Sequence, residues 1–269
     1  MINNDLMSPL FTIDLAVIEQ MVYQAMLPFF RIAAFLSVIP LIGSQLVSPL
    51  NRVVLAIALS FAIAPSIPPL ASELVFSFDI LLEVAKQILI GIAFGFTLLL
   101  FFHIFALAGQ LIALQMGLGF ASMIDPSNGV SVPIVSQFYS ILVGILFFAI
   151  NGHLVAIEAL AQSFQFIPLQ GYWDFSSAGY QLVAAGSWMF TAALLIALPA
   201  ITAILIVNLS FGVMTRAAPQ LNIFSLGFPF TLVFGVFILW VSNQGFLGQF
   251  NLISAEAFEL LYSLLPPAP

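Results

Sequence analysis

The sequence contains no cysteine and very few charges. Of its 269 residues only 6% are charged, and the charged side chains comprise four basic and eleven acidic ones. The lack of cysteine excludes disulfide bonds, thiolate metal ligands and cysteine nucleophiles. Four basic side chains are too few for a nucleic-acid surface, because phosphate binding requires clustered lysine and arginine. A soluble domain carries about 25% charged residues, so this chain lacks the side chains for a hydrated surface.

The sequence also lacks the motifs of common enzymes. It has neither a Gly-x-x-x-x-Gly-Lys-Ser/Thr loop for nucleotide phosphates nor a Gly-x-Ser-x-Gly elbow. The two histidines, His103 and His153, do not form a His-Glu-x-x-His motif, so zinc binding is not expected. We therefore expect no catalytic residue, no metal and no cofactor.

Apolar side chains are what the sequence has in abundance. They make up 62% of the residues, with 29 phenylalanines and a mean hydropathy of +1.20. This composition predicts an all-α integral membrane protein. We expect about six long, kinked helices, at residues 15–43, 53–71, 80–108, 134–157, 180–210 and 223–247. Acidic residues 254–261 predict a short amphipathic helix near the end of the sequence.

Several uncharged runs are too long for one bilayer crossing. The run from Phe175 to Thr215 has 41 residues and would form a helix roughly 60 Å long, about twice the ~30 Å hydrocarbon core. Such helices must tilt, break, or be covered by protein instead of lipid. Pro28, Pro199 and Pro229 lie inside predicted helices, so kinks are expected there.

Orientation in the membrane is weakly specified by the charges. Arg52 and Arg216 fall in odd-numbered connections, and most acidic residues fall in even-numbered connections or beyond the last helix. The positive-inside rule then places the N-terminus outside. Lys86 favours the opposite orientation.

Arg31 lies deep in the apolar run "AMLPFFRIAAFLSVIP". A charge at the bilayer centre is costly, so such a residue faces a partner or a wet cavity. Two readings remain open: Arg31 snorkels or pairs with an acid of a neighbouring helix, or it has a direct functional role. For His153, with Asn151 and Gly152, we expect hydrogen bonds across a helix interface. Glu158 follows His153 by five residues, off its helix face.

Glycines mark two further features of the sequence. Gly91 and Gly95 form a Gly-x-x-x-Gly pair, a spacing that lets helices approach closely, although glycine is frequent enough in membrane helices for such a pair to arise by chance. The stretch from Gly109 to Pro133 combines four glycines with Asp125-Pro126 between two apolar runs. On its own this stretch is an ordinary connection with a turn at Asp125-Pro126, or non-helical backbone that lines a cavity.

Several segments together resemble one known family. The stretch "FGVMTRAAPQLNIFSLGFP" resembles the most recognisable signature of the FliR family of flagellar export-gate proteins and their injectisome relatives. The other matching stretches occur in the same order: "FFRIAAFLSVIPLIG", "SPLNRVVLAIALS", "LQMGLGFASMIDP", "FFAINGHLVAIEALAQSF" and "ALPAITAILIVNLSFG". The resemblance covers nearly the whole chain, and "FFAINGH" favours the flagellar branch.

The resemblance implies a fold and partners that composition does not show. Family members resemble a FliP-like part fused to a FliQ-like part, with helical hairpins stacked in a spiral export-gate complex. The implied sections are a FliP-like part at 1–133, C-terminal hairpins at 134–250 that become FliQ-like towards their end, and an acidic tail at 251–269. The implied partners are FliP, FliQ and FlhB homologues, membrane lipid and flagellar polypeptides in transit, with no nucleic acid. The implied location is the flagellar basal body in the bacterial inner membrane.

The resemblance also places a channel plug in the glycine-rich stretch, at about residues 110–133. Glycine gives such a loop the backbone conformations it needs, methionine and phenylalanine would form a soft apolar seal, and a hydrophobic constriction blocks ions by dewetting. The expected gate residues are Gln110, Gln115, Met116, Gly117, Gly119, Phe120, Met123, Asp125 and Pro126. The polar residues expected at structural or intersubunit contacts are Arg31, Arg52, His153, Glu158, Arg216, Gln220 and Asn222.

Other functions would leave different traces. An injectisome export-gate homologue would share the same fold. A stand-alone small-solute transporter would be monodisperse without partners. An intramembrane enzyme would need His103, His153 or Asp125 for a chemical step, and it is the reading that the sequence favours least.

Overall fold

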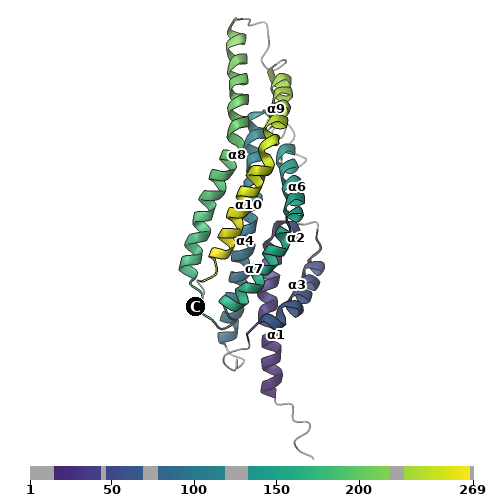
Figure 1. The fold of residues 1–269 in the computed structure, drawn as a ribbon, viewed down its shortest axis with the longest axis vertical. Helices are drawn as coiled ribbons and strands as arrows, with labels where there is room; N and C mark the ends of the chain where they lie inside the picture. Colours follow the sequence, from purple (N-terminus) through teal and green to yellow (C-terminus); the bar gives the residue numbers. More distant parts are fainter. Residues whose placement is uncertain (1–14, 44–46, 69–77, 119–132, 218–226, 267–269) are drawn as a thin grey trace, which may run out of the picture. The chain divides into compact units, whose positions relative to one another are not determined.

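The computed structural model describes residues 15–43, 47–68, 78–118, 133–217 and 227–266, and within these ranges every regular element is helical (Figure 1). The elements run in the order α1 (Leu15–Val38), α2 (Pro40–Gly43), α3 (Pro49–Ile63), η2 (Ala64–Ser66), α4 (Phe78–Gln115), α6 (Ile134–Ala149), α7 (Gly152–Phe166), α8 (Phe175–Ala217), α9 (Phe228–Ser242), η5 (Asn243–Gly245) and α10 (Phe246–Ser263).

The helices have the length and composition of membrane spans. Four described stretches are long and apolar enough to cross a bilayer: residues 49–66, 78–115, 175–216 and 229–263. The bent pair α6 and α7 raises the number to five when it is taken as one broken span. The chain is therefore an all-α integral membrane protein, as its composition predicts.

The structure corrects the predicted helix at residues 134–157. This segment forms two helices, α6 and α7, which meet at an angle of 68°. Asn151 sits between them with a φ of 58°, in the left-handed region that asparagine tolerates better than most residues. A hydropathy pattern continues across such a break, because both helices are apolar.

The three prolines at predicted kinks occupy different helical positions. Pro28 and Pro199 lie inside α1 and α8, as expected. Pro229 lies in the first turn of α9, where its missing N–H has no intrahelical partner to lose. It therefore lies at the start of α9 and not in its interior.

Two compact units make up the fold, and each gathers separate parts of the chain. Unit 1 comprises residues 1–96, 157–178 and 263–269, and unit 2 comprises residues 97–156 and 179–262. The predicted consecutive sections 1–133, 134–250 and 251–269 do not coincide with these units. Their assignment to FliP-like and FliQ-like parts stays a prediction.

An aromatic cluster forms the core of unit 2. Phe101 of α4 lies 5.9 Å, between ring centroids, from Phe250 of α10 and 6.0 Å from Phe147 of α6. Phe105 of α4 contacts Phe246 and Phe250 of α10 in the same way. Aromatic pairs in such tilted and edge-on geometries contribute beyond the area they bury, so α4, α6 and α10 are held by one cluster.

The acidic segment near the end of the sequence belongs to this core. The helix predicted at residues 254–261 extends over Phe246–Ser263, and its buried face carries Phe246, Phe250, Ile253, Ala257 and Leu261. These positions recur every three or four residues, which places them on one side of the helix. The acidic Glu256 and Glu259 lie on the exposed side.

Candidate functional site

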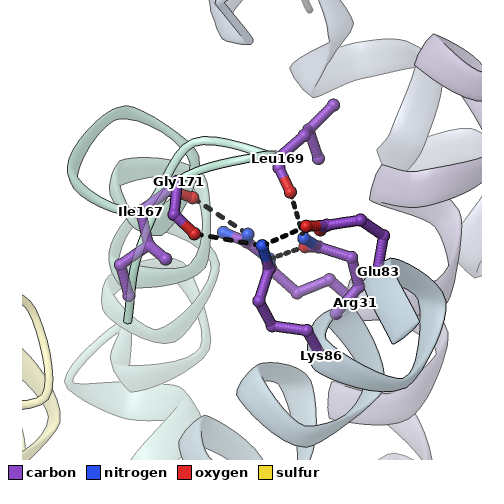
Figure 2. Close-up of polar contacts among 7 residues, drawn as sticks. Arg31, Glu83, Lys86, Ile167, Leu169 and Gly171 are labelled. Atoms are coloured by element: carbon purple, nitrogen blue, oxygen red, sulfur yellow. Dashed lines mark hydrogen bonds and ion pairs between the residues drawn. The ribbon is translucent and has the colours of Figure 1, made fainter. Parts of the chain in front are cut away.

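Arg31 is fully buried in unit 1, where its guanidinium binds the end of α7. Nε donates to Oε1 of Gln87 at 2.7 Å. Nη1 donates to the backbone oxygen of Ser163 at 2.8 Å and to its Oγ at 3.0 Å. Nη2 donates to the backbone oxygen of Ile167 at 2.9 Å (Figure 2). The carbonyls at the end of a helix carry partial negative charge, so a cation is favourable there. The Ser163 oxygen also accepts the N–H of Ile167.

Two side chains of α4 extend this pattern along the connection that follows α7. Nε2 of Gln87 donates to the backbone oxygen of Leu169 at 2.9 Å. Nζ of Lys86 donates to the backbone oxygen of Gly171 at 3.0 Å and pairs with Glu83 at 2.6 Å. Figure 2 shows Arg31 and Lys86 pointing towards this connection. We call Arg31, Lys86 and Gln87, with the carbonyls that they bind, the carbonyl clamp.

The clamp corrects the first of the two sequence-based readings of Arg31, and a direct functional role stays a prediction. The side chain does not snorkel, because none of it is exposed. Its hydrogen bonds end on neutral oxygens of Gln87, Ser163 and Ile167, and its guanidinium carbon lies 4.2 Å from the ring centre of Phe164. The expected acidic hydrogen-bond partner is therefore replaced by helix-end carbonyls and an aromatic face.

The Gly-x-x-x-Gly pair places α4 against α1 within unit 1. A Cβ at Gly91 would collide with the backbone oxygen of Arg31, and one at Gly95 would lie 2.8 Å from Cβ of Val38. Both distances are too short for real carbon contacts. The predicted close approach of helices at Gly91 and Gly95 is confirmed, and it brings Arg31 beside Gln87.

Helix α4 extends to Gln115 and so includes the first residues of the glycine-rich stretch, which corrects the loop predicted from residue 110. The N–H of Gly117 donates to the oxygen of Leu114, and the N–H of Leu118 donates to the oxygen of Ala113, both at 3.0 Å. Gly117 has a φ of 83°. This pair of bonds with a left-handed glycine is a Schellman motif, which stops a helix. The predicted need for glycine at 117 is confirmed.

Met116 departs from the prediction that it seals a channel. Its side chain is only 1% exposed and belongs to the interior of unit 2. A Cβ at Gly235 of α9 would lie 2.6 Å from Cγ of Met116, so the methionine rests directly on the bare backbone of α9. Such burial is at odds with a side chain that faces a channel, and it gives Met116 an anchoring position instead.

The remaining predicted gate residues fall into two groups. Gln110 is exposed and Gln115 is half-buried on the last turns of α4. The others lie outside the described residues: Gly119, Phe120, Met123, Asp125 and Pro126. Their place in a gate stays a prediction.

The two helices that flank the glycine-rich stretch are joined at close range. A Cβ at Gly109 would lie 2.7 Å from Cα of Ser136 at the start of α6. Oγ of Ser136 donates to the backbone oxygen of Ala106 at 2.6 Å. These contacts fix the separation of α4 and α6 at the point where the stretch begins and ends.

His153 lies at the break between α6 and α7, half-buried beside Phe148, with ring centroids 5.1 Å apart. Among the described residues its Nδ1 is buried without a hydrogen-bond partner, so the predicted bond across an interface is not formed there by that atom. Gly152 fits beneath the ring of Phe147, where a Cβ would lie 2.5 Å from Cε2. Glu158 is exposed and accepts a hydrogen bond from Gln162 one turn along α7.

The other predicted polar residues in the described part of the chain do not form a cluster. Nη2 of Arg52 donates to the backbone oxygen of Val47 at 2.9 Å, just before α3 begins. Arg216 is exposed in the last turn of α8, while Gln220 and Asn222 lie outside the described residues. Intersubunit roles for these residues stay predictions.

Sequence reasoning missed the residues that complete these contacts. No sequence motif marked the four residues Gln87, Ser136, Ser163 and Gly235. Gln87 had one weak signal, since it is an uncharged polar residue beside Lys86 at the start of a long apolar run. In the described part of the chain no three histidine, aspartate or glutamate side chains gather as a metal site would require.

The sequence was compared with known families and proteins. It matches the family described as bacterial export proteins, family 1, over residues 22–257. It is 38% identical to the flagellar biosynthetic protein FliR of Escherichia coli K12 over 243 residues, which cover 90% of this chain and 92% of that protein. It is 29% identical to FliR of Bacillus subtilis, over 80% of this chain and 84% of the relative. It is 26% identical to the surface presentation of antigens protein SpaR of Shigella flexneri, over 80% and 83%. The chain therefore belongs to family 1 of the bacterial export proteins.

Proposed function

We propose that this chain is a non-enzymatic subunit of the flagellar type III protein-export gate in the bacterial inner membrane. The observation that carries the proposal is the family match across residues 22–257. The identity to FliR of Escherichia coli, 38%, exceeds that to SpaR of Shigella flexneri, 26%. This difference favours the flagellar branch over an injectisome homologue.

The surface of the helices supports a role in an assembly. Only 28% of an 18-residue apolar stretch of the long helix α8 is buried within the chain. A helix of 43 residues extends about 65 Å, well beyond the ~30 Å of a hydrocarbon core. Lipid covers at most part of an apolar helix of that length, so neighbouring protein covers the rest. We propose FliP, FliQ and FlhB homologues as those neighbours.

Co-purification tests the assembly. The tagged chain is extracted in mild detergent with and without co-expressed FliP and FliQ homologues, and the mass of the product is measured. We expect a defined complex with the partners and an aggregating product without them. A monodisperse lone chain that carries a small solute across liposome membranes would instead establish a stand-alone transporter.

The glycine-rich stretch is proposed as part of the seal. Gly117 ends α4, and Met116 anchors that end, so the sealing role falls to the residues beyond them, among them Phe120 and Met123. Flexible apolar side chains adapt to irregular partners, and an apolar constriction excludes ions by dewetting. Exported flagellar polypeptides would displace this seal as they pass.

Deletion of residues 117–123 tests the seal. We expect the complex to assemble with unchanged mass and the membrane to leak small ions. The leak is measured as potassium efflux from vesicles that contain equal amounts of purified complex. Equal efflux from wild-type and deleted complexes would show that the stretch does not seal the gate.

A further inference from the structure

Met116 and Gly235 make a contact that the helix pattern alone does not require. A Cβ at Gly235 would lie 2.6 Å from Cγ, 2.7 Å from Cε and 3.0 Å from Sδ of Met116. The methionine side chain therefore lies lengthwise on the one position of α9 that has no side chain. Both residues are buried in unit 2.

The contact holds the last residue before the helix stop. Met116 is followed at once by Gly117, whose left-handed backbone turns the chain out of α4. Eight residues before the stop, Gly109 packs on Ser136 of α6. The last turns of α4 are thus held by α6 at Gly109 and by α9 at Met116.

We propose that Gly235 is a positioning residue of the export gate: it seats Met116 and so fixes the direction in which the chain leaves α4. The inference rests on the proposed function and deepens it by assigning a role to a residue of α9. Because methionine is flexible, a methyl group added at 235 displaces the side chain and leaves both helices intact.

The first experiment tests the contact itself. The chain contains no cysteine, so two introduced cysteines report on one pair. Met116→Cys with Gly235→Cys is expected to form a disulfide in the assembled complex under mild oxidation, because the two Cβ positions lie within disulfide reach. Met116→Cys with Val236→Cys serves as the control, since Val236 is 61% exposed on a different side of α9. Equal cross-linking of both pairs, or of neither, would overturn the contact.

The second experiment tests the role. Gly235→Ala is compared with Gly212→Ala, because a Cβ at Gly212 meets nothing within 4 Å and alanine favours a helix at either position. We expect Gly235→Ala to raise potassium efflux per complex at least threefold and Gly212→Ala to leave it unchanged. Adding Met116→Ala to Gly235→Ala is expected to return efflux towards the wild-type rate, because the new methyl group then occupies the vacated space.

The outcomes distinguish the positioning of Met116 by Gly235, which we call the seat, from the proposed function. Wild-type efflux from Gly235→Ala, beside a leak from the complex that lacks residues 117–123, would overturn the seat and leave the gate intact. No leak from either variant would count against the gate itself. Where Gly235→Ala fails to assemble, Met116→Ala decides, because it adds no atom: a leak supports the seat, and wild-type efflux overturns it.

Discussion

At the scale of single residues, Arg31 shows how a charge is accommodated in an apolar protein. Burying a cation requires that its donors be satisfied, and here the acceptors include the backbone oxygens of Ser163 and Ile167 at the end of α7. The arginine gains acceptors, and the helix end gains donors. The planar guanidinium donates from three nitrogens in fixed directions, whereas lysine donates from a single nitrogen.

Removal of this charge is expected to loosen the connection after α7. In Arg31→Met the carbonyls of Ser163 and Ile167 lose their guanidinium donors. The Ser163 oxygen keeps the N–H of Ile167, so the expected cost is that of leaving the Ile167 oxygen unsatisfied, about 1–3 kcal/mol. We expect faster chymotryptic cleavage at Tyr172, which is 85% exposed, in the detergent-solubilised complex. Arg216→Met removes an exposed charge and is the control, for which cleavage at that site stays at the wild-type rate. An unchanged rate in Arg31→Met would argue against the clamp.

Gly91 gives a second prediction at this scale. Gly91→Ala places a methyl group against the backbone oxygen of Arg31, and neither atom is at the end of a flexible side chain. We expect a lower melting temperature of the complex. Gly186→Ala, with open space around its Cβ, is expected to leave the melting temperature unchanged or raise it through the helix preference of alanine. Equal melting temperatures for the two variants would contradict the close packing of α1 and α4.

At the scale of elements, the break between α6 and α7 depends on two adjacent residues. Asn151 supplies a left-handed backbone, and Gly152 leaves room for the ring of Phe147. The oxygen of Asn151 accepts from the N–H groups of Leu154 and Val155, so the first turn of α7 starts from it. The 68° angle is thus built from local backbone geometry.

Substitution at Asn151 tests this origin of the angle. Asn151→Gly keeps access to a φ of 58° and is expected to retain the stability of the complex. Asn151→Val is expected to lower it by about 1–2 kcal/mol, because a branched side chain is strained in the left-handed region. Thermal unfolding in detergent measures the difference. A valine variant as stable as the glycine variant would show that the break tolerates an ordinary helical backbone.

The elements also show what could be predicted from the sequence. Long apolar runs predicted the helices α4 and α8, because hydropathy reports burial along a whole span. The break at Asn151 and the inward position of α10 were missed, since the first depends on one backbone angle and the second on contacts with residues far along the chain. In the candidate site, Arg31 and Gly117 stood out by their chemistry. Gln87 and Gly235 became visible only when folding brought them to a partner.

At the scale of the whole molecule, the exposed apolar surface of α8 is longer than a bilayer is thick. Val183 is 78% exposed and Val213 is 63% exposed, and thirty helical residues separate them, about 45 Å along the axis. A hydrocarbon core of ~30 Å does not cover both ends of this apolar surface when the helix is perpendicular to the membrane.

Thiol footprinting tests whether lipid or partner protein covers the exposed apolar surface of α8. Val183→Cys and Val213→Cys are introduced separately and treated with a membrane-impermeant maleimide. Without partner subunits we expect labelling of at least one of the two positions, and with FliP and FliQ homologues we expect protection of both. Val241→Cys, at an exposed position near the end of α9, provides a comparison within the same unit. Protection of both α8 positions in the absence of partners would indicate that lipid alone covers the helix.

The interleaving of the two units has a consequence for biosynthesis. Unit 1 needs residues beyond 262, and Nε1 of Trp173 donates to the backbone oxygen of Leu264 at 3.3 Å. Once the first 180 residues have been synthesised, all of unit 1 except residues 263–269 has been made. Unit 1 is therefore completed only after all of unit 2 has been synthesised, because unit 2 ends at residue 262.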